Sequence, residues 1–131
     1  TTVMYAASLT KAMFAHLVMQ LVDDRVIALD TPIVKYLPKP LPSYEKYADL
    51  ADDARWERIT PRMLLSHTSG LPNWRFFAPD KKLHLQFEPG VWFGYSAEGI
   101  NLRQLVYEQP PGNAAGAMMR SPVLDRFDST R

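Results

Sequence analysis

The residues best suited to chemistry are a serine and a lysine three positions apart, Ser8 and Lys11. They open a segment, 8–22, that has no Gly or Pro and is rich in Ala, Leu and Met, which predicts a helix. Side chains three positions apart share one face of a helix. A serine hydroxyl can attack a carbonyl carbon when a neutral amine takes its proton. The pair therefore indicates acyl-transfer chemistry.

The position of Lys11 on this helix favours the neutral amine. On a wheel of about 100° per residue with Ser8 at zero, Lys11 lies at roughly 300°, beside Val18. Further apolar residues share the face of this pair: Ala12, Ala15 and Met19. We expect that face to be buried, and both desolvation and the positive end of the helix dipole disfavour a charged amine. The alternative is a lysine that reaches past the core to water.

Other candidate groups lack a supporting pattern. A second Ser-x-x-Lys, from Ser43 to Lys46, lies in a proline-rich connector and is interpreted as a chance match. The three histidines lack metal-ligand spacing, and His67 is interpreted as structural. The segment from Gly94 to Gly99 is one residue too long for a Gly-x-Ser-x-Gly elbow. A Ser–His–Asp triad stays open but has no local pattern in its favour.

Caps and prolines predict the elements that position these residues. Asp30-Thr31-Pro32 and Thr60-Pro61 each have the pattern of a cap followed by Pro, and Ser96 or Glu98 is expected to begin the last helix. We therefore expect four helices, at 8–22, just after Pro32, at 62–67 and from about 96 to 108. The proline-rich stretch 38–58 is expected to be a surface connector with a helical turn at 47–55, and 91–95 is expected to be extended. Strand candidates are few, so the chain is predicted to be mostly α.

Composition narrows the classes further. The 131 residues suit one domain, and 47% hydrophobic with 22% charged residues is ordinary globular composition. A net charge of +1 gives the chain no strong electrostatic field that would attract nucleic acid. The lack of Cys excludes disulfide bonds and zinc sites with thiolate ligands. We expect no metal, no cofactor, no transmembrane segment and, since Thr1 opens the chain without a basic segment, no signal peptide.

Five segments, in order, resemble the serine β-lactamase and penicillin-binding-protein superfamily, specifically its class C-like branch of β-lactamase-related serine hydrolases and esterases. The segments are Tyr5–Lys11, Val18–Pro38, Ile59–Pro72, Phe87–Gly90 and Phe93–Ser96. The third, with His67-Thr68-Ser69-Gly70, is the most specific match. The resemblance is strong over residues 3–108 and weak over 109–131.

The resemblance implies roles for three matched positions. Ser8 would be the acylated nucleophile and Lys11 its base partner. Tyr95 would carry protons to the leaving group and from the deacylating water. The Ser8 backbone N–H would be the first oxyanion-hole donor, and His67-Thr68-Ser69-Gly70 would be structural. The implied substrate is a small-molecule ester, amide or β-lactam.

Two departures from the family pattern shape the expected architecture. Ala97 stands where the family's Tyr-x-Asn motif has Asn, which resembles the esterase-like members. No Lys-Thr-Gly or His-x-Gly segment follows Glu108, and no opening strands precede Thr1. We therefore expect residues 1–131 to be an incomplete, apparently truncated catalytic domain. It would be the helical part of an α/β serine β-lactamase/transpeptidase-like fold, with the central antiparallel sheet largely missing.

Three hypotheses about function follow. The first is a serine hydrolase that acts by acyl transfer through Ser8. The second is a non-catalytic fragment or homologue without the oxyanion strand, since one lost donor costs about a hundredfold to a thousandfold in rate. The third is a small helical binding module. In an incomplete domain, the surface that would pack on the missing sheet is expected to be exposed and apolar, including part of the Ala12–Ala15–Met19 face. Such an uncovered apolar face would favour self-association. The compartment, whether periplasmic, secreted or cytoplasmic, stays open.

Overall fold

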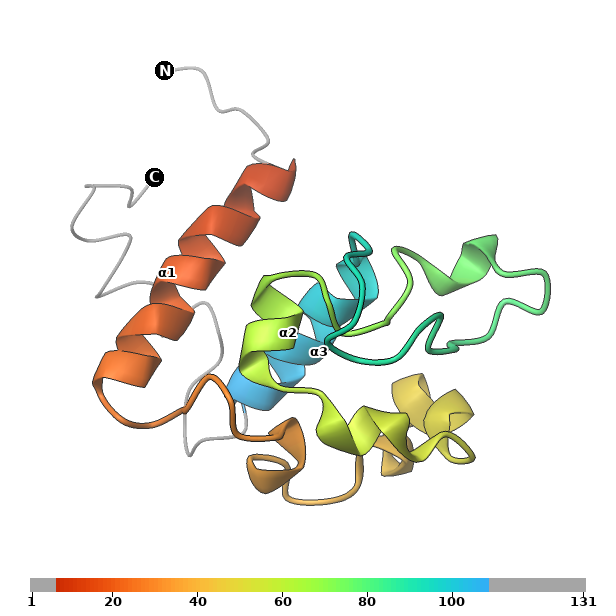
Figure 1. Ribbon diagram of the computed structural model, residues 1–131, viewed down its shortest axis with the longest axis horizontal. Helices are drawn as coiled ribbons and strands as arrows, with labels where there is room; N and C mark the ends of the chain where they lie inside the picture. The colour runs from red at the N-terminus through yellow and green to blue at the C-terminus, as the bar shows by residue number, and fades with distance from the viewer. Residues whose placement is uncertain (1–6, 109–131) are drawn as a thin grey trace.

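The protein consists of helices joined by long loops in the computed structural model, which describes residues 7–108 (Figure 1). The α-helices are α1 (Thr10–Asp23), α2 (Pro61–Leu65) and α3 (Ala97–Glu108). The 3₁₀ helices are η1 (Ala7–Leu9), η2 (Ile33–Lys35), η3 (Leu41–Ser43), η4 (Glu45–Leu50), η5 (Ala54–Arg58) and η6 (Arg75–Phe77). No strand occurs within 7–108, which confirms the mostly α prediction. The weakly matched segment 109–131 lies outside the described residues.

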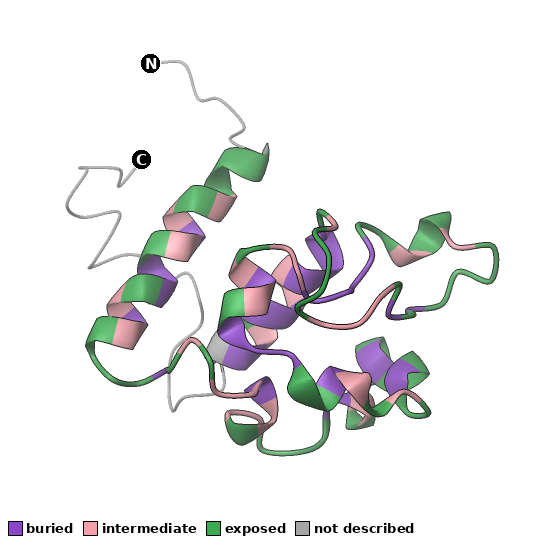
Figure 2. Cartoon of the chain, in the orientation of Figure 1, coloured by how far each residue is buried: buried purple, intermediate pink, exposed green. Residues whose placement is uncertain are grey.

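Helix α1 continues directly from η1, as the helix-forming composition of 8–22 predicts. Its buried residues are Phe14, Leu17, Val18 and Leu21. They centre on roughly 230° of the wheel, so Lys11 lies at the edge of the buried face and is half-buried. The expected burial of the Ala12–Ala15–Met19 face was wrong, because the larger side chains turn toward the core. Ala12 is exposed, Ala15 is half-buried and Met19 is 42% exposed. Buried, intermediate and exposed positions all occur along α1 (Figure 2).

Helices α2 and α3 lie side by side at the centre of the molecule, and α1 runs along one flank (Figure 1). Thr60 caps α2, because its Oγ1 accepts a hydrogen bond from the Met63 N–H at 3.3 Å. Ser96 caps α3 in the same way, and its Oγ accepts from the Gly99 N–H at 2.7 Å. Both starts confirm the predictions from the sequence. One hydrophobic core joins α1 to these two helices.

The segment between α1 and α2 differs from its prediction in two respects. Asp30 does not cap the second helix, which is the short η2 that follows Pro32. Its carboxylate instead accepts two hydrogen bonds from the Arg62 guanidinium, at 2.6 and 2.8 Å. The 38–58 connector is also more than a surface excursion. Its 3₁₀ turns bury four large side chains in the core: Leu41, Tyr47, Leu50 and Trp56.

A long irregular loop, 66–96, leads from α2 to α3. The stretch 91–95, expected to be extended, forms no strand, because no strand among residues 7–108 lies beside it to pair with. Arg75 ties this loop to α3 through two 3.0 Å hydrogen bonds to the buried Glu98 carboxylate. Burial raises the pKa of Glu98, but the hydrogen bonds and charge of Arg75 more than offset this, so the pKa lies below its ordinary value.

Candidate active site

Ser8 and Lys11 meet at the exposed end of α1. The Lys11 Nζ donates a hydrogen bond to the Ser8 Oγ at 2.7 Å. Ser8 lies in η1, two residues before α1 begins, so one continuous helical segment fixes the spacing of the pair. The predicted contact is therefore present. Ser8 itself is exposed, so the pair is less buried than the sequence led us to expect.

Tyr95 joins this pair from a segment 87 positions along the chain. Its hydroxyl lies 3.3 Å from the Ser8 Oγ, within hydrogen-bond distance. The Lys11 Nζ also lies 5.4 Å from the centre of the Tyr95 ring. The polar contact of the Tyr95 hydroxyl with Lys11 and its hydrogen bond with Ser8 lower the pKa of Tyr95 below its ordinary value. The structure therefore brings together the three residues predicted as a site.

His67 lies against Tyr95 on the side of α2. The two rings are tilted by 35° with centroids 4.6 Å apart, and the Phe93 ring lies edge-on to His67 at 6.0 Å. The His67 Nδ1 accepts a hydrogen bond from the Ser96 N–H at 3.2 Å. Sequence reasoning classed His67 as structural and missed this contact with the site. No local spacing relates residues 67 and 95.

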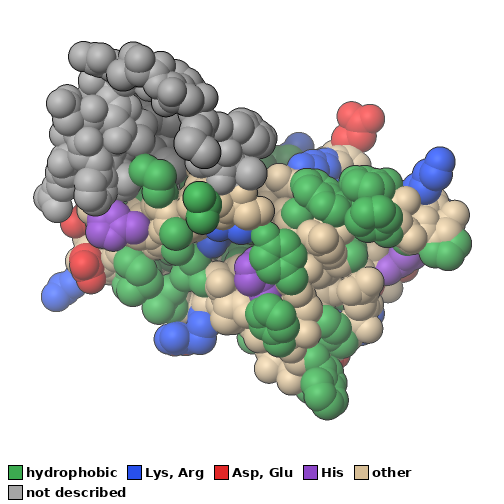
Figure 3. Space-filling model, turned by 90° about the horizontal axis from the view of Figure 1, so that it is seen from above, with side chains coloured by type: hydrophobic (Ala, Val, Ile, Leu, Met, Phe, Trp, Pro, Cys, Tyr) green, Lys and Arg blue, Asp and Glu red, His purple; other side chains and the backbone are tan. Residues whose placement is uncertain are grey.

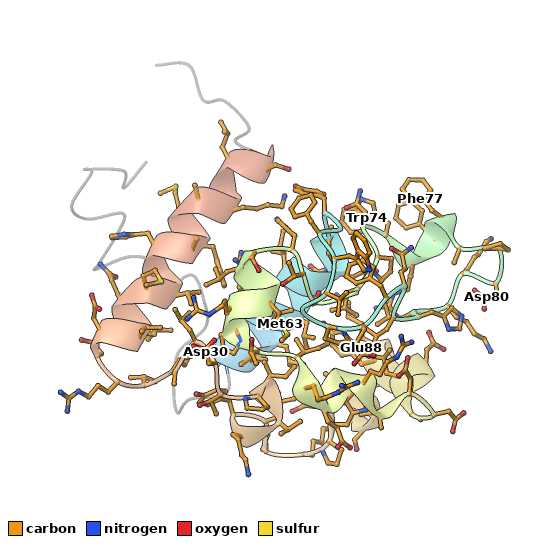
Figure 4. All side chains as sticks on the ribbon, viewed as in Figure 1. Asp30, Met63, Trp74, Phe77, Asp80 and Glu88 are labelled. Carbon is orange, nitrogen blue, oxygen red and sulfur yellow. The ribbon has the colours of Figure 1, made fainter. Side chains whose placement is uncertain are left out.

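An open cavity of about 460 Å³ extends from Tyr95 along the loop 72–86. Aromatic and proline side chains line one part of it, including Trp74 and Phe77, which lie close together on the loop (Figure 4). Polar groups line another part, among them Lys82 and His84. Tyr95 links this cavity to the pair, because it lines the cavity and its hydroxyl contacts Ser8, whereas Ser8 and Lys11 are not themselves lining residues.

Ala97, the departure from the family's Tyr-x-Asn motif, is buried as the first residue of α3. Its N–H donates to the backbone oxygen of Asn73 at 3.2 Å and to the Asn73 Oδ1 at 3.3 Å. A methyl group at position 97 offers no polar contact to a bound molecule. Asn73, whose side chain contacts the start of α3 in this way, also lines the cavity.

Of the other candidate residues, His84 lines the cavity, whereas Ser43, Lys46 and His16 do not. Within residues 7–108 no hydrogen bond joins Ser43 to Lys46, in agreement with a chance match. His16 contacts Gln20 on the exposed side of α1, and His84 pairs with Asp80 at 2.6 Å. The part of the chain that the structure describes holds no cluster of three metal-ligating side chains. It also holds no helix with the length and apolarity to cross a membrane.

Comparison with known families agrees with this geometry. The sequence pattern of the family described as Beta-lactamase matches residues 1–130. The chain belongs to the beta-lactamase family. This match confirms the superfamily predicted from the sequence. The all-helical structure of residues 7–108 is consistent with a helical portion of the beta-lactamase fold.

Two curated relatives are described as fimbrial assembly proteins. The putative fimbrial assembly protein FimD, serogroup D, of Dichelobacter nodosus is 27% identical over 137 residues. The probable fimbrial assembly protein FimD, serogroup H1, of the same organism is 28% identical over 137 residues. Each match covers 92% of this beta-lactamase-family chain and 32% of the relative. The chain therefore spans about a third of the length of these relatives.

Proposed function

We propose that the protein is a serine hydrolase that acts by acyl transfer through Ser8 on an ester, amide or β-lactam. Membership of the beta-lactamase family supports acyl-transfer chemistry of this general type. The observation that carries the proposal is the triangle of contacts at Ser8. Its Oγ lies 2.7 Å from the Lys11 Nζ and 3.3 Å from the Tyr95 hydroxyl.

The triangle supplies each proton transfer that the reaction needs. After Lys11 loses one proton, its amine takes the proton of Ser8 while the Oγ bonds to the substrate carbonyl carbon. The carbonyl π electrons move to oxygen and return as the bond to the leaving group breaks. The Tyr95 hydroxyl donates a proton to that leaving group. The resulting phenolate takes a proton from water, whose oxygen bonds to the acyl carbon. The bond from that carbon to the Ser8 Oγ then breaks, and the Lys11 ammonium returns its proton to the Oγ, which restores Ser8 and the neutral amine.

The cavity beside Tyr95 supports a substrate with an apolar group. Trp74 and Phe77 provide apolar contact area, while Asn73 provides an amide for hydrogen bonding. Ala97 at the family's Asn position removes one amide that would hold a lactam or peptide side chain, which favours an ester-like substrate.

Labelling of the serine tests the proposal. The natural full-length protein is incubated with an activated ester or a fluorescent penicillin, and the acyl adduct is located by peptide mass spectrometry. We expect the adduct on Ser8, and its loss in Ser8→Ala and in Lys11→Met. The chain offers a matched control, because Ser43→Ala removes the serine of the second Ser-x-x-Lys and should leave labelling unchanged. An adduct that persists in Ser8→Ala would refute the proposal.

We also propose that the 131-residue chain associates with itself through exposed apolar side chains. Val91, Trp92 and Phe93 are 58%, 68% and 70% exposed, and they lie in a row beside Tyr95. Hydrophobic side chains form several groups on the face seen in Figure 3. Such a surface gains free energy when it is covered.

A further inference from the structure

His67 contacts the chain on both sides of Tyr95. Its backbone oxygen accepts a hydrogen bond from the Gly94 N–H at 2.8 Å. Its ring Nδ1 accepts another from the Ser96 N–H at 3.2 Å. The His67 ring also packs on the Tyr95 ring between these two bonds, with centroids 4.6 Å apart. One residue therefore holds the chain at the residue before the tyrosine and at the residue after it, and also contacts its ring.

The backbone of His67 has an unusual conformation, which allows the residue to make these contacts on both sides of Tyr95. Its φ is +58°, and it directly follows the last residues of α2. The Thr68 N–H donates to the Met63 oxygen at 2.9 Å, which is the helix-ending pattern that normally takes Gly or Asn in the left-handed position. A histidine there accepts a steric cost that Gly avoids. The ring and its nitrogen provide contacts that Gly lacks.

We propose that His67 is a positioning residue that holds the Tyr95 hydroxyl against Ser8, and that it does so only while its Nδ1 is free of a proton. The inference rests on the proposed function, since it concerns the tyrosine assigned to proton transfer. A protonated ring carries N–H on both nitrogens and no longer accepts from the Ser96 N–H. Protonation of His67 therefore releases one of the two bonds that fix the Tyr95 backbone.

The surroundings of His67 also favour its neutral form. Burial lowers the pKa of His67 below 6.5, and the cations Arg103 of α3 and Lys11 of α1 lower it further. Tyr95 is the titratable group that packs directly on the ring. The hydroxyl is therefore held in place at neutral pH, and the hold weakens as pH falls through the lowered pKa of His67.

The test uses His67→Asn and His67→Gly in the natural full-length protein. Asn suits the left-handed backbone, and its Oδ1 can accept from the Ser96 N–H without titrating. Gly suits the backbone but has neither ring nor acceptor. We expect kcat to fall by about a hundredfold in His67→Gly with little change in KM, because the hydroxyl is misplaced while the cavity stays intact. His67→Asn should restore much of kcat and lack the acid limb that His67 gives the wild-type pH profile.

Nuclear magnetic resonance supplies a readout that does not depend on turnover. In the wild type, the Ser96 amide resonance should shift with the same midpoint as the His67 ring, and in His67→Asn it should not shift in that range. A Ser96 resonance that ignores His67 titration would overturn the inference, as would an acid limb unchanged in His67→Asn. A protein that is never acylated at Ser8 would instead overturn the proposed function, while the resonance still shows whether His67 holds the tyrosine loop.

Discussion

Removing the hydroxyl of Tyr95 tests its role in proton transfer while leaving in place the ring that contributes to packing. Tyr95→Phe keeps the ring that packs on His67 and loses the oxygen 3.3 Å from the Ser8 Oγ. We expect turnover of an activated ester by the full-length protein to fall by about a hundredfold to ten-thousandfold, the usual contribution of a positioned acid and base. KM should change little. Steady-state kinetics measure both constants, and the thermal unfolding midpoint checks that the fold is intact.

Comparison with Ser8→Ala determines how the Tyr95→Phe result is interpreted. Ser8→Ala should abolish turnover, because no other nucleophile occupies its place beside Lys11 among the described residues. If Ser8→Ala is inactive and Tyr95→Phe turns over normally, another group carries the proton and the assignment of Tyr95 is wrong.

Single residues of the site differ in how far the sequence could reveal them. Ser8 and Lys11 were predictable because helix geometry alone brings positions three apart together. Tyr95 was found only through the family resemblance, since a separation of 87 positions carries no geometric information. The contacts of His67 with the segment around Tyr95 were not predictable, because they depend on a positive φ at residue 67 and on the path of the loop back to α2.

At the scale of elements, Ser96 fixes the start of α3 immediately after Tyr95. Its Oγ accepts from the Gly99 N–H at 2.7 Å and donates to the Pro72 oxygen at 2.8 Å, and the residue is buried. We expect Ser96→Ala to lower the free energy of unfolding by about 1–2 kcal/mol, the cost of losing an N-cap. Turnover should fall less than in Tyr95→Phe. Urea denaturation measures the loss.

Ser43→Ala is the matched control for that experiment. Ser43 is exposed, and among the described residues it forms hydrogen bonds through its backbone alone: its N–H donates to the Pro40 oxygen at 2.9 Å and its oxygen accepts from the Lys39 Nζ at 3.4 Å. Its stability should match the wild type. Equal stability of Ser96→Ala and Ser43→Ala would show that the cap contributes nothing to α3.

The sequence predicted helices better than the segments between them. Thr60-Pro61 and Ser96 are local signals, and both caps were found where those residues stand. Asp30 also looked like a cap, but its carboxylate bonds to Arg62, 32 positions away. The burial of Tyr47 and Trp56 in the connector likewise depends on distant packing. Local pattern therefore predicts where helices start, whereas long-range contacts decide what the loops bury.

At the scale of the whole molecule, the prediction that remains is association through the exposed apolar surface. Large apolar side chains in contact with water cost free energy that a second surface can recover. Trp92 and Phe93 are more than two-thirds exposed, and Phe77, in η6 of the same long loop, is 73% exposed. We expect a solution of the 131-residue chain to show mass above that of the monomer, rising with concentration, and to enhance the fluorescence of a hydrophobic dye.

Trp92→Ser should reduce both the association and the dye signal, because it removes the largest side chain of the exposed row 91–93. Glu57→Ser, an exposed position without a large apolar side chain, serves as the control and should change neither. Sedimentation velocity over a concentration series measures the mass. A chain that stays a monomer at high concentration and binds no dye would mean that these side chains cover one another in solution. The expectation of an uncovered apolar face would then be wrong.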